Sequence, residues 1–501
     1  MNKVTKNIIA NYLGKLWGFF SIFIFVRLYI DLLGVESYAI INFYTVILGL
    51  LVFADAGLTA TLTRELARDI SIETKANLVY TFERIYIGIC LLIIFIVLIS
   101  ANTLSNNFLA SETYSPEEVA YYIRLIGIGV ALQLFSTLYE GGLQGLQQQV
   151  LTNKVRVVWS VFRSGVVLLP IYFFPKLDVY FWWQILCNIV LLYVFRYFLF
   201  FLLSNKNSVF SMQLLKSTSK YALGMMGIAF ISAINIQIDK LVTSKYLTME
   251  LFGYYSIAST LSQLPILIVM PIVVAVFPLF SLSVSQNDTK SIIKNFHKYS
   301  FLIIAIAAPV AFCIALYSIP LITLWTGKPE IAHTINYVVK MLIIGGLFLC
   351  MQLTPFYLAL ANGFTKINLY SGIAGLIIII PLMIYSIDHY GMIGATIPWV
   401  FINVSTFFLI GRYIVNKFLP KQVYSWMVWD SLFPIIITIL IGITIEIIFK
   451  DFNEQYLFIV KSFIIGILSG CMNVLLYNKK YLDNVLINFT SILNVVRRNS
   501  K

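Results

Sequence analysis

Long apolar runs recur through this sequence, and they restrict the folds open to the chain more than any other feature. IGICLLIIFIVLI (87–99) and FLIIAIAAPVAFCIALYSIPLI (301–322) are two examples. An α-helix that crosses a bilayer needs about 20 mainly apolar residues. Hydrophobic residues make up 60% of the chain and charged residues 11%, whereas a soluble domain has roughly 45–50% and 25%. The sequence therefore predicts a polytopic membrane protein.

Hydropathy and polar breaks predict an all-α fold of about fourteen transmembrane helices, since no segment shows the alternation over about ten residues that is typical of a barrel strand. The predicted spans are 8–30, 37–62, 79–100, 120–145, 157–174, 179–203, 221–243, 252–282, 300–323, 333–361, 367–387, 392–413, 431–449 and 456–477. The first run is too long for a signal peptide and lacks a cleavage site, so it is interpreted as an uncleaved span.

The charges of the loops predict the orientation. The segments on one side hold 21 Lys and Arg residues, and the loops on the other side hold four. Basic loops stay in the cytoplasm, so both termini are predicted to be cytoplasmic. The basic segments are the amino terminus, 63–78, 146–156, 204–220, 283–299, 362–366, 414–430 and the carboxyl tail. Topology thus explains much of the net charge of +13, and a nucleic-acid partner loses its support.

Residue types that build catalytic or metal sites are scattered. The five cysteines lie far apart and form no C-x-x-C pair, which argues against a disulfide framework or a thiolate metal site. The three histidines show no metal-binding spacing. No loop is long enough for a catalytic domain, so no enzyme activity and no cofactor are predicted, apart from possible H⁺ or Na⁺ coupling.

A faint internal repeat predicts two lobes. LLGVESYAIINFY (32–44) and YLTMELFGYYSIA (246–258) share a Leu, a Glu, an aromatic residue and a small residue at matching positions. Weak repeats are typical of transporters. The repeat predicts two parallel six-helix lobes around a central cavity, followed by an extra helix pair and an amphipathic tail. These divisions are 1–203, 221–413, 431–477 and 478–501.

Several segments resemble the polysaccharide transporters that flip O-antigen repeat units, a family of the multidrug/oligosaccharidyl-lipid/polysaccharide exporter superfamily. The resemblance is carried by NYLGKLWGF (11–19), FADAGLTATLTRELAR (53–68), INIQIDKLVTSKYLTMELFGYYSIA (234–258) and HYGMIGATIPWVF (389–401). It implies an alternating-access flippase in a bacterial cytoplasmic (inner) membrane. The implied substrate is an undecaprenyl-diphosphate-linked glycan, and the implied partners are membrane lipid, a polysaccharide polymerase and chain-length proteins.

Charges inside the predicted spans are the candidate site residues, because intramembrane charges mark substrate or ion pathways. The basic candidates for holding the diphosphate are Lys15, Arg27, Arg163, Arg196, Lys240 and Lys340. Lys15 is predicted to form an inner gate, and Lys240 and Lys340 a positive outer part of the cavity. Glu140 and its neighbouring glutamines suit sugar hydroxyls, or else bond between helices. Basic residues nearer the helix ends are expected to snorkel to the interface.

Two acidic residues are candidates for ion coupling or gating. Asp55 lies in the apolar part of span two, and Asp239 lies on a polar stripe of span seven. Asp55 is expected either to pair with Lys15 or to bind a coupling cation or proton, and an intramembrane charge more often has an ionic partner.

Other functions compete with the flippase interpretation. A multidrug exporter of the same superfamily needs acidic groups for organic cations, whereas the intramembrane charge here is mostly basic. A lipid II flippase fits the same features. A membrane polymerase or ligase needs a catalytic constellation on an outward loop, which the short loops do not offer.

Overall fold

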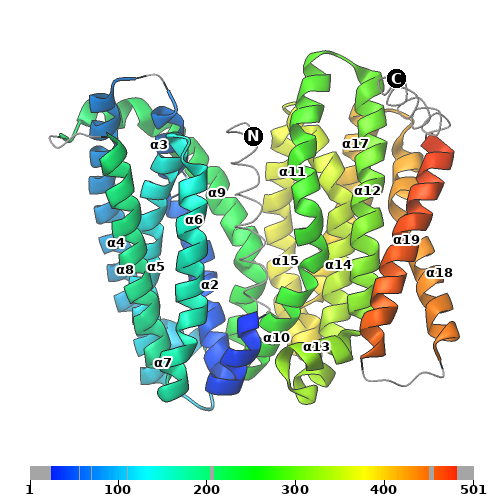
Figure 1. Cartoon of the computed structure of the whole chain (residues 1–501), viewed down its shortest axis with the longest axis horizontal. Coiled ribbons are helices and arrows are strands. Elements are labelled where there is room, and N and C mark those ends of the chain that lie inside the picture. Colours follow the sequence, from blue (N-terminus) through cyan, green and yellow to red (C-terminus); the bar gives the residue numbers. More distant parts are fainter. Residues whose placement is uncertain are drawn as a thin grey trace, which may run out of the picture. The chain divides into compact units, whose positions relative to one another are not determined.

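A computed structural model of the chain describes residues 24–55, 57–68, 70–109, 111–203, 208–450 and 456–481. Throughout these ranges the regular structure is helical (Figure 1). Eleven of the described helices are long and apolar enough to cross a membrane. The predicted all-α, polytopic class is therefore confirmed.

The chain folds into two compact units. The first comprises the residues up to Ser256 with Leu324–Lys328 and Gly372–Ala395, and the second comprises Ile257–Thr323, Pro329–Ser371 and the residues from Thr396 onward. Helices that lie within the first unit are residues 24–33, α2 (Val35–Asp55), α3 (Leu58–Leu66), α4 (Ile72–Phe108), α5 (Pro116–Gly145), α6 (Gln149–Ser160), the π-helix η1 (Val161–Val166), α7 (Leu168–Phe173), α8 (Leu177–Leu203) and α9 (Met212–Tyr246).

Helices that lie within the second unit are α11 (Leu264–Ser285), α12 (Thr289–Leu316), α14 (Pro329–Ala361), α16 (Ile397–Ser405), the π-helix η2 (Thr406–Gly411), α17 (Arg412–Phe418), the π-helix η3 (Ser425–Leu432), α18 (Phe433–Ile448) and α19 (Leu457–Tyr481). The helices α10 (Met249–Ser262), α13 (Ser318–Thr326) and α15 (Thr365–Gly394) each contribute residues to both units.

The predicted spans that are absent from the set of eleven have separate explanations. Most of 8–30 lies outside the described residues. The span 37–62 is divided between α2 and α3. The apolar stretch Val35–Leu51 of α2 is shorter than the eleven spanning helices, and α3 has only nine residues. The span 221–243 falls within α9, a helix whose side chains are described only in part.

Helix α5 forms the centre of the first unit. It packs against α2, α3, α4 and α8, and α4, α5 and α8 lie side by side in Figure 1. Small residues allow this close packing: Gly127 faces Val97 of α4, and Gly142 faces Leu199 of α8. Two-thirds of the apolar window of α5 is buried, whereas α4 turns residues such as Phe95 and Ile99 outward. Exposed apolar side chains on a spanning helix are suited to lipid.

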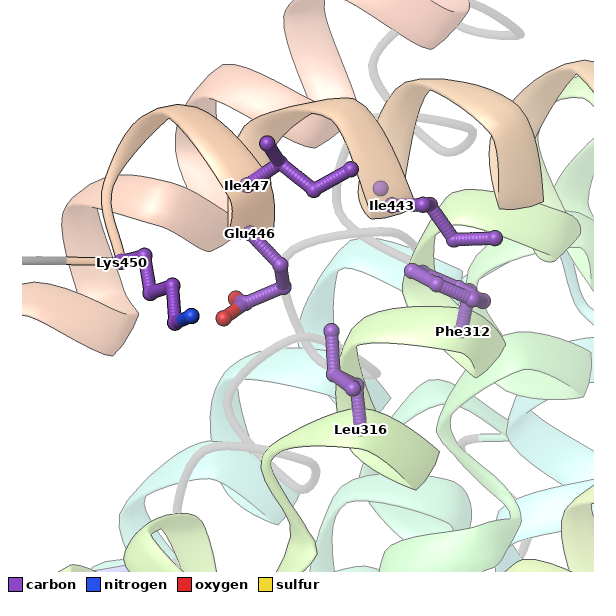
Figure 2. A pocket seen from close by; sticks show the side chains of 7 residues that line it. Phe312, Leu316, Ile443, Glu446, Ile447 and Lys450 are labelled. Atoms are coloured by element: carbon purple, nitrogen blue, oxygen red, sulfur yellow. The ribbon is translucent and has the colours of Figure 1, made fainter.

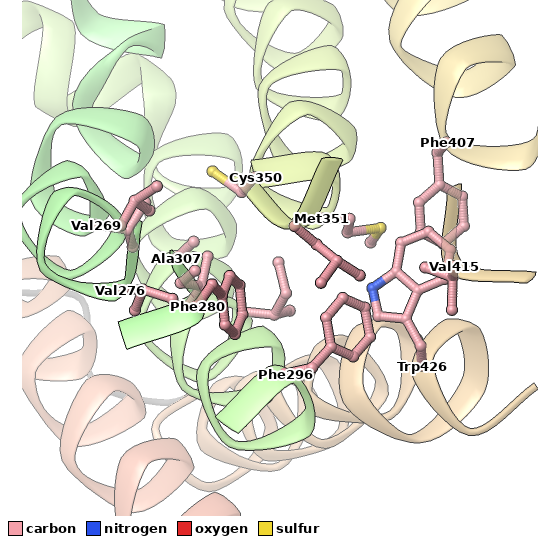
Figure 3. Close-up of a cluster of buried hydrophobic side chains, with 14 of the residues drawn as sticks. Val269, Val276, Phe280, Phe296, Ala307, Cys350, Met351, Phe407, Val415 and Trp426 are labelled. Atoms are coloured by element: carbon pink, nitrogen blue, oxygen red, sulfur yellow. The ribbon is translucent and has the colours of Figure 1, made fainter. Parts of the chain in front are cut away.

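A large apolar cluster holds the second unit together (Figure 3). Trp426 of η3 packs between Phe296 of α12 and Phe407 of η2, with ring centroids 6.4 and 4.9 Å apart. Met351 of α14 and Phe280 of α11 also belong to the cluster. Helices from distant parts of the sequence therefore share one core. Through Trp426, this core also attaches η3, which directly precedes α18, to the second unit.

Helix α15 breaks at the start of the motif GMIGA (391–395). Gly391 has φ of +57°, a conformation that L side chains rarely adopt. A Cβ on Gly394 would overlap the backbone of Ser386. Both glycines are therefore needed for the tight reversal between two predicted spans.

Glu36, the acidic residue of the predicted repeat, organises the loop that follows α4, which is predicted to face outward. The hydroxyl of Ser111 donates to its carboxylate, and the backbone amides of Glu112 and Thr113 donate to it at 3.3 and 3.1 Å. Burial alone raises the pKa of Glu36, but these hydrogen bonds outweigh it and hold the pKa below its ordinary value. One carboxylate thus connects this loop to the first turn of α2.

Candidate functional site

Asp55 is the last residue of α2, where the helix breaks before α3 begins at Leu58. Its carboxylate accepts a hydrogen bond from the hydroxyl of Thr59, which is also 2.7 Å from the hydroxyl of Tyr86. Asp55 is buried, and no ion pair joins it to a cation in the described part of the chain. Its predicted partner, Lys15, lies outside the described residues.

The threonines after Asp55 attach α3 to α5. The hydroxyl of Thr63 donates to the backbone carbonyl of Gly141 at 2.9 Å. A Cβ on Gly145 would lie 2.6 Å from the backbone oxygen of Thr63, which is too close for any real side chain. The glycines of EGGLQG (140–145) therefore let α3 pack closely against α5 beside Asp55.

Glu140 is held in a buried ion pair with Arg156 of α6. The Nε of Arg156 lies 2.6 Å from one carboxylate oxygen, and a terminal guanidinium nitrogen contacts the other. Gln144 donates to the same carboxylate at 3.2 Å. The side chain of Glu140 is 9% exposed and that of Arg156 45%. A bidentate pair of this kind is geometrically specific, so Glu140 fixes α5 against the start of α6.

Arg196 of α8 pairs with Glu83 of α4, with Nε 3.1 Å from the carboxylate. The guanidinium also lies over the ring of Phe200, 4.8 Å from its centroid. Arg27, at the other end of the first unit, pairs with Asp31 at 3.6 Å and contacts the backbone oxygen of Leu324 at 3.4 Å. These two candidate cations thus have carboxylate partners.

Arg163 has a different environment, in the π-helix η1. Its Nε donates to the amide oxygen of Gln184, and its guanidinium lies over the rings of Tyr44 and Trp159, 5.2 and 4.8 Å from their centroids. No carboxylate in the described ranges pairs with it. Its contacts are aromatic faces and an amide, which leave its positive charge uncompensated.

The π-helix depends on side chains of α8 and of the first helix. Trp183 donates to the carbonyl of Phe162 at 2.9 Å, Gln184 to that of Arg163 at 3.1 Å, and Tyr29 to that of Ser164 at 2.6 Å. Backbone groups within a membrane must find partners in the protein. Because π-turns are frequent at functional sites, this arrangement draws attention to Arg163.

Asp239 and Lys240 are consecutive residues of α9. Asp239 accepts a hydrogen bond from the hydroxyl of the fully buried Tyr255 at 3.2 Å. Lys240 and, in the second unit, Lys340 of α14 have no carboxylate partner among the described residues. Lys340 lies 5.6 Å from the ring centroid of Tyr337.

The geometry sorts the predicted site residues into two groups. Arg27, Arg196 and Glu140 are neutralised by an ionic partner, whereas Arg163, Lys240 and Lys340 are not. An uncompensated charge away from water is costly, so the second group is the one able to bind an anion. The carboxylates of Asp55 and Asp239 each accept a hydroxyl bond, an arrangement compatible with binding a proton or a small cation.

The partners of these charges come from elements that the sequence does not place beside them. The loop charges predict that Arg156 ends the cytoplasmic loop 146–156, but α6 begins at Gln149 and brings Arg156 to Glu140. Gln133, one of the glutamines of α5 near Glu140, accepts a hydrogen bond from the hydroxyl of Tyr44 at 2.8 Å. Trp182 and Trp183, which precede Gln184, are the sequence signal for contacts of this kind, because an indole N–H within a membrane needs a hydrogen-bond acceptor.

Comparisons with known proteins agree with one another. A family model described as "Polysaccharide biosynthesis protein" matches residues 31–329. The chain is similar to a putative O-antigen transporter of Shigella flexneri, with 23% identity over 376 residues, or 73% of this chain and 87% of that protein. It is also similar to the teichuronic acid biosynthesis protein TuaB of Bacillus subtilis, with 21% identity over 336 residues, or 66% and 67% of the two chains.

Two solved transporter structures share the fold. An inward-facing multidrug resistance MATE family transporter of the MOP superfamily superposes with a TM-score of 0.66 at 16% identity, covering 84% of this chain and 100% of that one. The lipid II flippase MurJ in an inward closed conformation gives a TM-score of 0.66 at 15% identity, covering 94% and 98%. At such low identities the likeness concerns the fold alone.

Proposed function

Since the chain belongs to the polysaccharide biosynthesis and O-antigen transporter family, we propose that it translocates a polyprenyl-diphosphate-linked oligosaccharide from the cytoplasmic to the outer leaflet. The substrate is an O-antigen or similar polysaccharide repeat unit. The movement requires that a diphosphate and a hydrated sugar chain pass the hydrocarbon region. The transporter must therefore supply cations for the diphosphate and polar groups for the sugar.

The observation that carries this proposal is the set of cations without a carboxylate partner. Arg163, Lys240 and Lys340 lie on predicted spans, and no described acidic side chain neutralises them. Their positive charge favours an anionic substrate over the organic cations of a multidrug exporter. A guanidinium suits phosphate because its planar fork can bind two oxygens.

The remaining candidate residues act beside this set in the proposal. Lys15 captures the diphosphate at the cytoplasmic entrance, and Arg27 assists near the outer end. Arg196 and Glu140 pair with Glu83 and Arg156 and so position α8 and α5. In the proposal these two residues also contribute polar contacts to the sugar.

In this proposal, Asp55 and Asp239 bind the coupling ion. Each carboxylate accepts a hydroxyl hydrogen bond, from Thr59 and from Tyr255 respectively. Asp55 is buried beside the break between α2 and α3, so a change in its charge alters the stability of that junction. Binding of H⁺ or Na⁺ then biases alternating access of the two predicted six-helix lobes, 1–203 and 221–413.

Reconstituted transport tests the proposal. The lipid-linked repeat unit is incorporated into proteoliposomes, and an impermeant glycosidase is added outside. Wild-type protein is expected to make almost all of the saccharide cleavable, because lipids from the inner leaflet reach the enzyme. If the cleaved fraction stays at that of protein-free vesicles, the proposed function is wrong.

A further inference from the structure

A pocket opens between α12 and α18 in the second unit, near the C-terminal ends of both helices, which are predicted to lie on the outer side (Figure 2). Its volume is about 360 Å³, and Phe312, Leu316, Ile443, Glu446 and Lys450 are among its lining residues. We propose that this pocket is a binding site for one resident anionic phospholipid of the outer leaflet, with a phosphatidylglycerol-type headgroup.

The walls of the pocket are suited to a lipid chain. Leu316, Ile443 and Ile447 are 41%, 49% and 69% exposed, so they present apolar surface outward rather than to the protein core. Phe312 lies against Gly442, where a Cβ would overlap its ring. The missing side chain at Gly442 brings the two helices close and forms the floor of the hollow. An acyl chain that lies there keeps the apolar walls covered.

Charged groups mark the headgroup end. Glu446 accepts the hydroxyl of Tyr317 and lies 3.1 Å from the Nζ of Lys461 on α19. Lys450 points toward the carboxylate of Glu446 in Figure 2, but it forms no ion pair with any described residue. One carboxylate and two ammonium groups leave a single net positive charge.

This charge pattern selects the class of lipid. The phosphodiester of phosphatidylglycerol carries one negative charge, which complements Lys450. Its glycerol hydroxyls are donors that suit the remaining lone pairs of Glu446. A polyprenyl diphosphate carries more negative charge than one uncompensated lysine offers, and its chain is much longer than the pocket. The site is therefore separate from the transport of the proposed substrate.

Native mass spectrometry of the delipidated protein tests this assignment. The protein is offered equal amounts of phosphatidylglycerol and phosphatidylethanolamine. Wild-type protein is expected to retain one phosphatidylglycerol in preference. Lys450→Gln is expected to weaken that binding about fivefold, because one basic residue near a lipid surface contributes about 1 kcal/mol. Ile443→Trp, which fills the pocket, is expected to abolish it.

Two matched variants control for general effects. Lys176→Gln removes an exposed lysine from another outward loop, and Ile467→Trp adds a tryptophan to the exposed face of α19. Both are expected to bind as wild type does. Equal retention of the two phospholipids, or unchanged binding in Lys450→Gln and Ile443→Trp, overturns the proposal.

A photoreactive residue at Leu316 identifies the occupant in cell membranes. Cross-linking to phosphatidylglycerol is expected, whereas cross-linking mainly to a polyprenyl lipid contradicts the assignment. Neither experiment requires transport, so its result is independent of whether the proposed function is correct.

Discussion

The carboxylate of Asp55 accepts a hydrogen bond from the hydroxyl of Thr59, across the break that separates α2 from α3. Thr59 in turn contacts Tyr86 of α4. The buried carboxylate of Asp55 is thus connected through Thr59 to α4. Protonation of this carboxylate, or binding of a cation to it, would therefore affect the contact between α2, α3 and α4.

Asp55→Asn tests the coupling role of this carboxylate. Asparagine keeps an oxygen that accepts from Thr59 but removes the charge. We expect normal protein levels and transport that no longer responds to an imposed H⁺ or Na⁺ gradient, measured in proteoliposomes. Glu117→Gln, at an exposed residue in the first turn of α5, provides the control variant. An unchanged gradient response in Asp55→Asn removes Asp55 from the coupling proposal.

Arg156→Ala is expected to lower the thermal stability of the protein. It leaves the buried Glu140 without its bidentate partner, and losing hydrogen bonds to a charged group costs roughly 1.5–3 kcal/mol. The midpoint of thermal unfolding in detergent measures the loss. The double variant Glu140→Arg/Arg156→Glu should recover part of the stability. If it recovers stability but not transport, Glu140 has a role in transport beyond the pair.

Gly145→Ala is expected to destabilise the contact between α3 and α5 by about 1–3 kcal/mol, the usual cost of overpacking. The added methyl group meets the backbone of Thr63, which cannot rotate away. Gly88→Ala in α4 is the matched control, because no atom lies within 4 Å of its Cβ position. Equal unfolding midpoints for the two variants would contradict the described packing.

Glu36 gives the outward loop a defined pH dependence. Its pKa in the folded protein lies below the ordinary value, so its stabilisation is complete above the unfolded pKa of about 4.3 and is lost as the pH falls through the folded pKa. Hydrogen exchange of residues 111–115, corrected for intrinsic rates, should show protection that disappears on acidification. Glu36→Gln should show weak protection at every pH; strong protection at neutral pH in this variant would exclude the assigned role.

The fold class was accessible from sequence because each spanning helix has its own apolar run. Loop charges predict the orientation for a similarly local reason, and the cytoplasmic position of both termini stays a prediction. The division of 37–62 into α2 and α3 was not predicted, since this segment is mostly apolar and contains no proline and only one charged residue. Hydropathy also does not predict the π-helix η1, because a π-turn and an α-turn can have the same amino-acid composition.

The candidate site was predictable by residue type but not by partner. Arg196 and Arg163 look alike in sequence, as single arginines within apolar spans. Glu83 neutralises Arg196 across 113 residues of sequence, whereas Arg163 has only Gln184 and aromatic rings around it. Which charge is compensated depends on the register between helices, and no local pattern encodes that register.

The most direct test of the central claim is the location of the lipid-linked repeat unit in cells that lack this gene. Intact spheroplasts are treated with an impermeant glycosidase, and the cleaved fraction of the polyprenyl-diphosphate saccharide is measured. We expect a complete but inaccessible repeat unit to accumulate. The wild-type gene and Lys176→Gln should restore access. Arg163→Ala and Lys340→Ala should reduce it about tenfold or more at normal protein levels, since each loses roughly 1.5–3 kcal/mol of charge-assisted binding. A normal, accessible pool in the deletion strain, or full access in both alanine variants, would contradict the account.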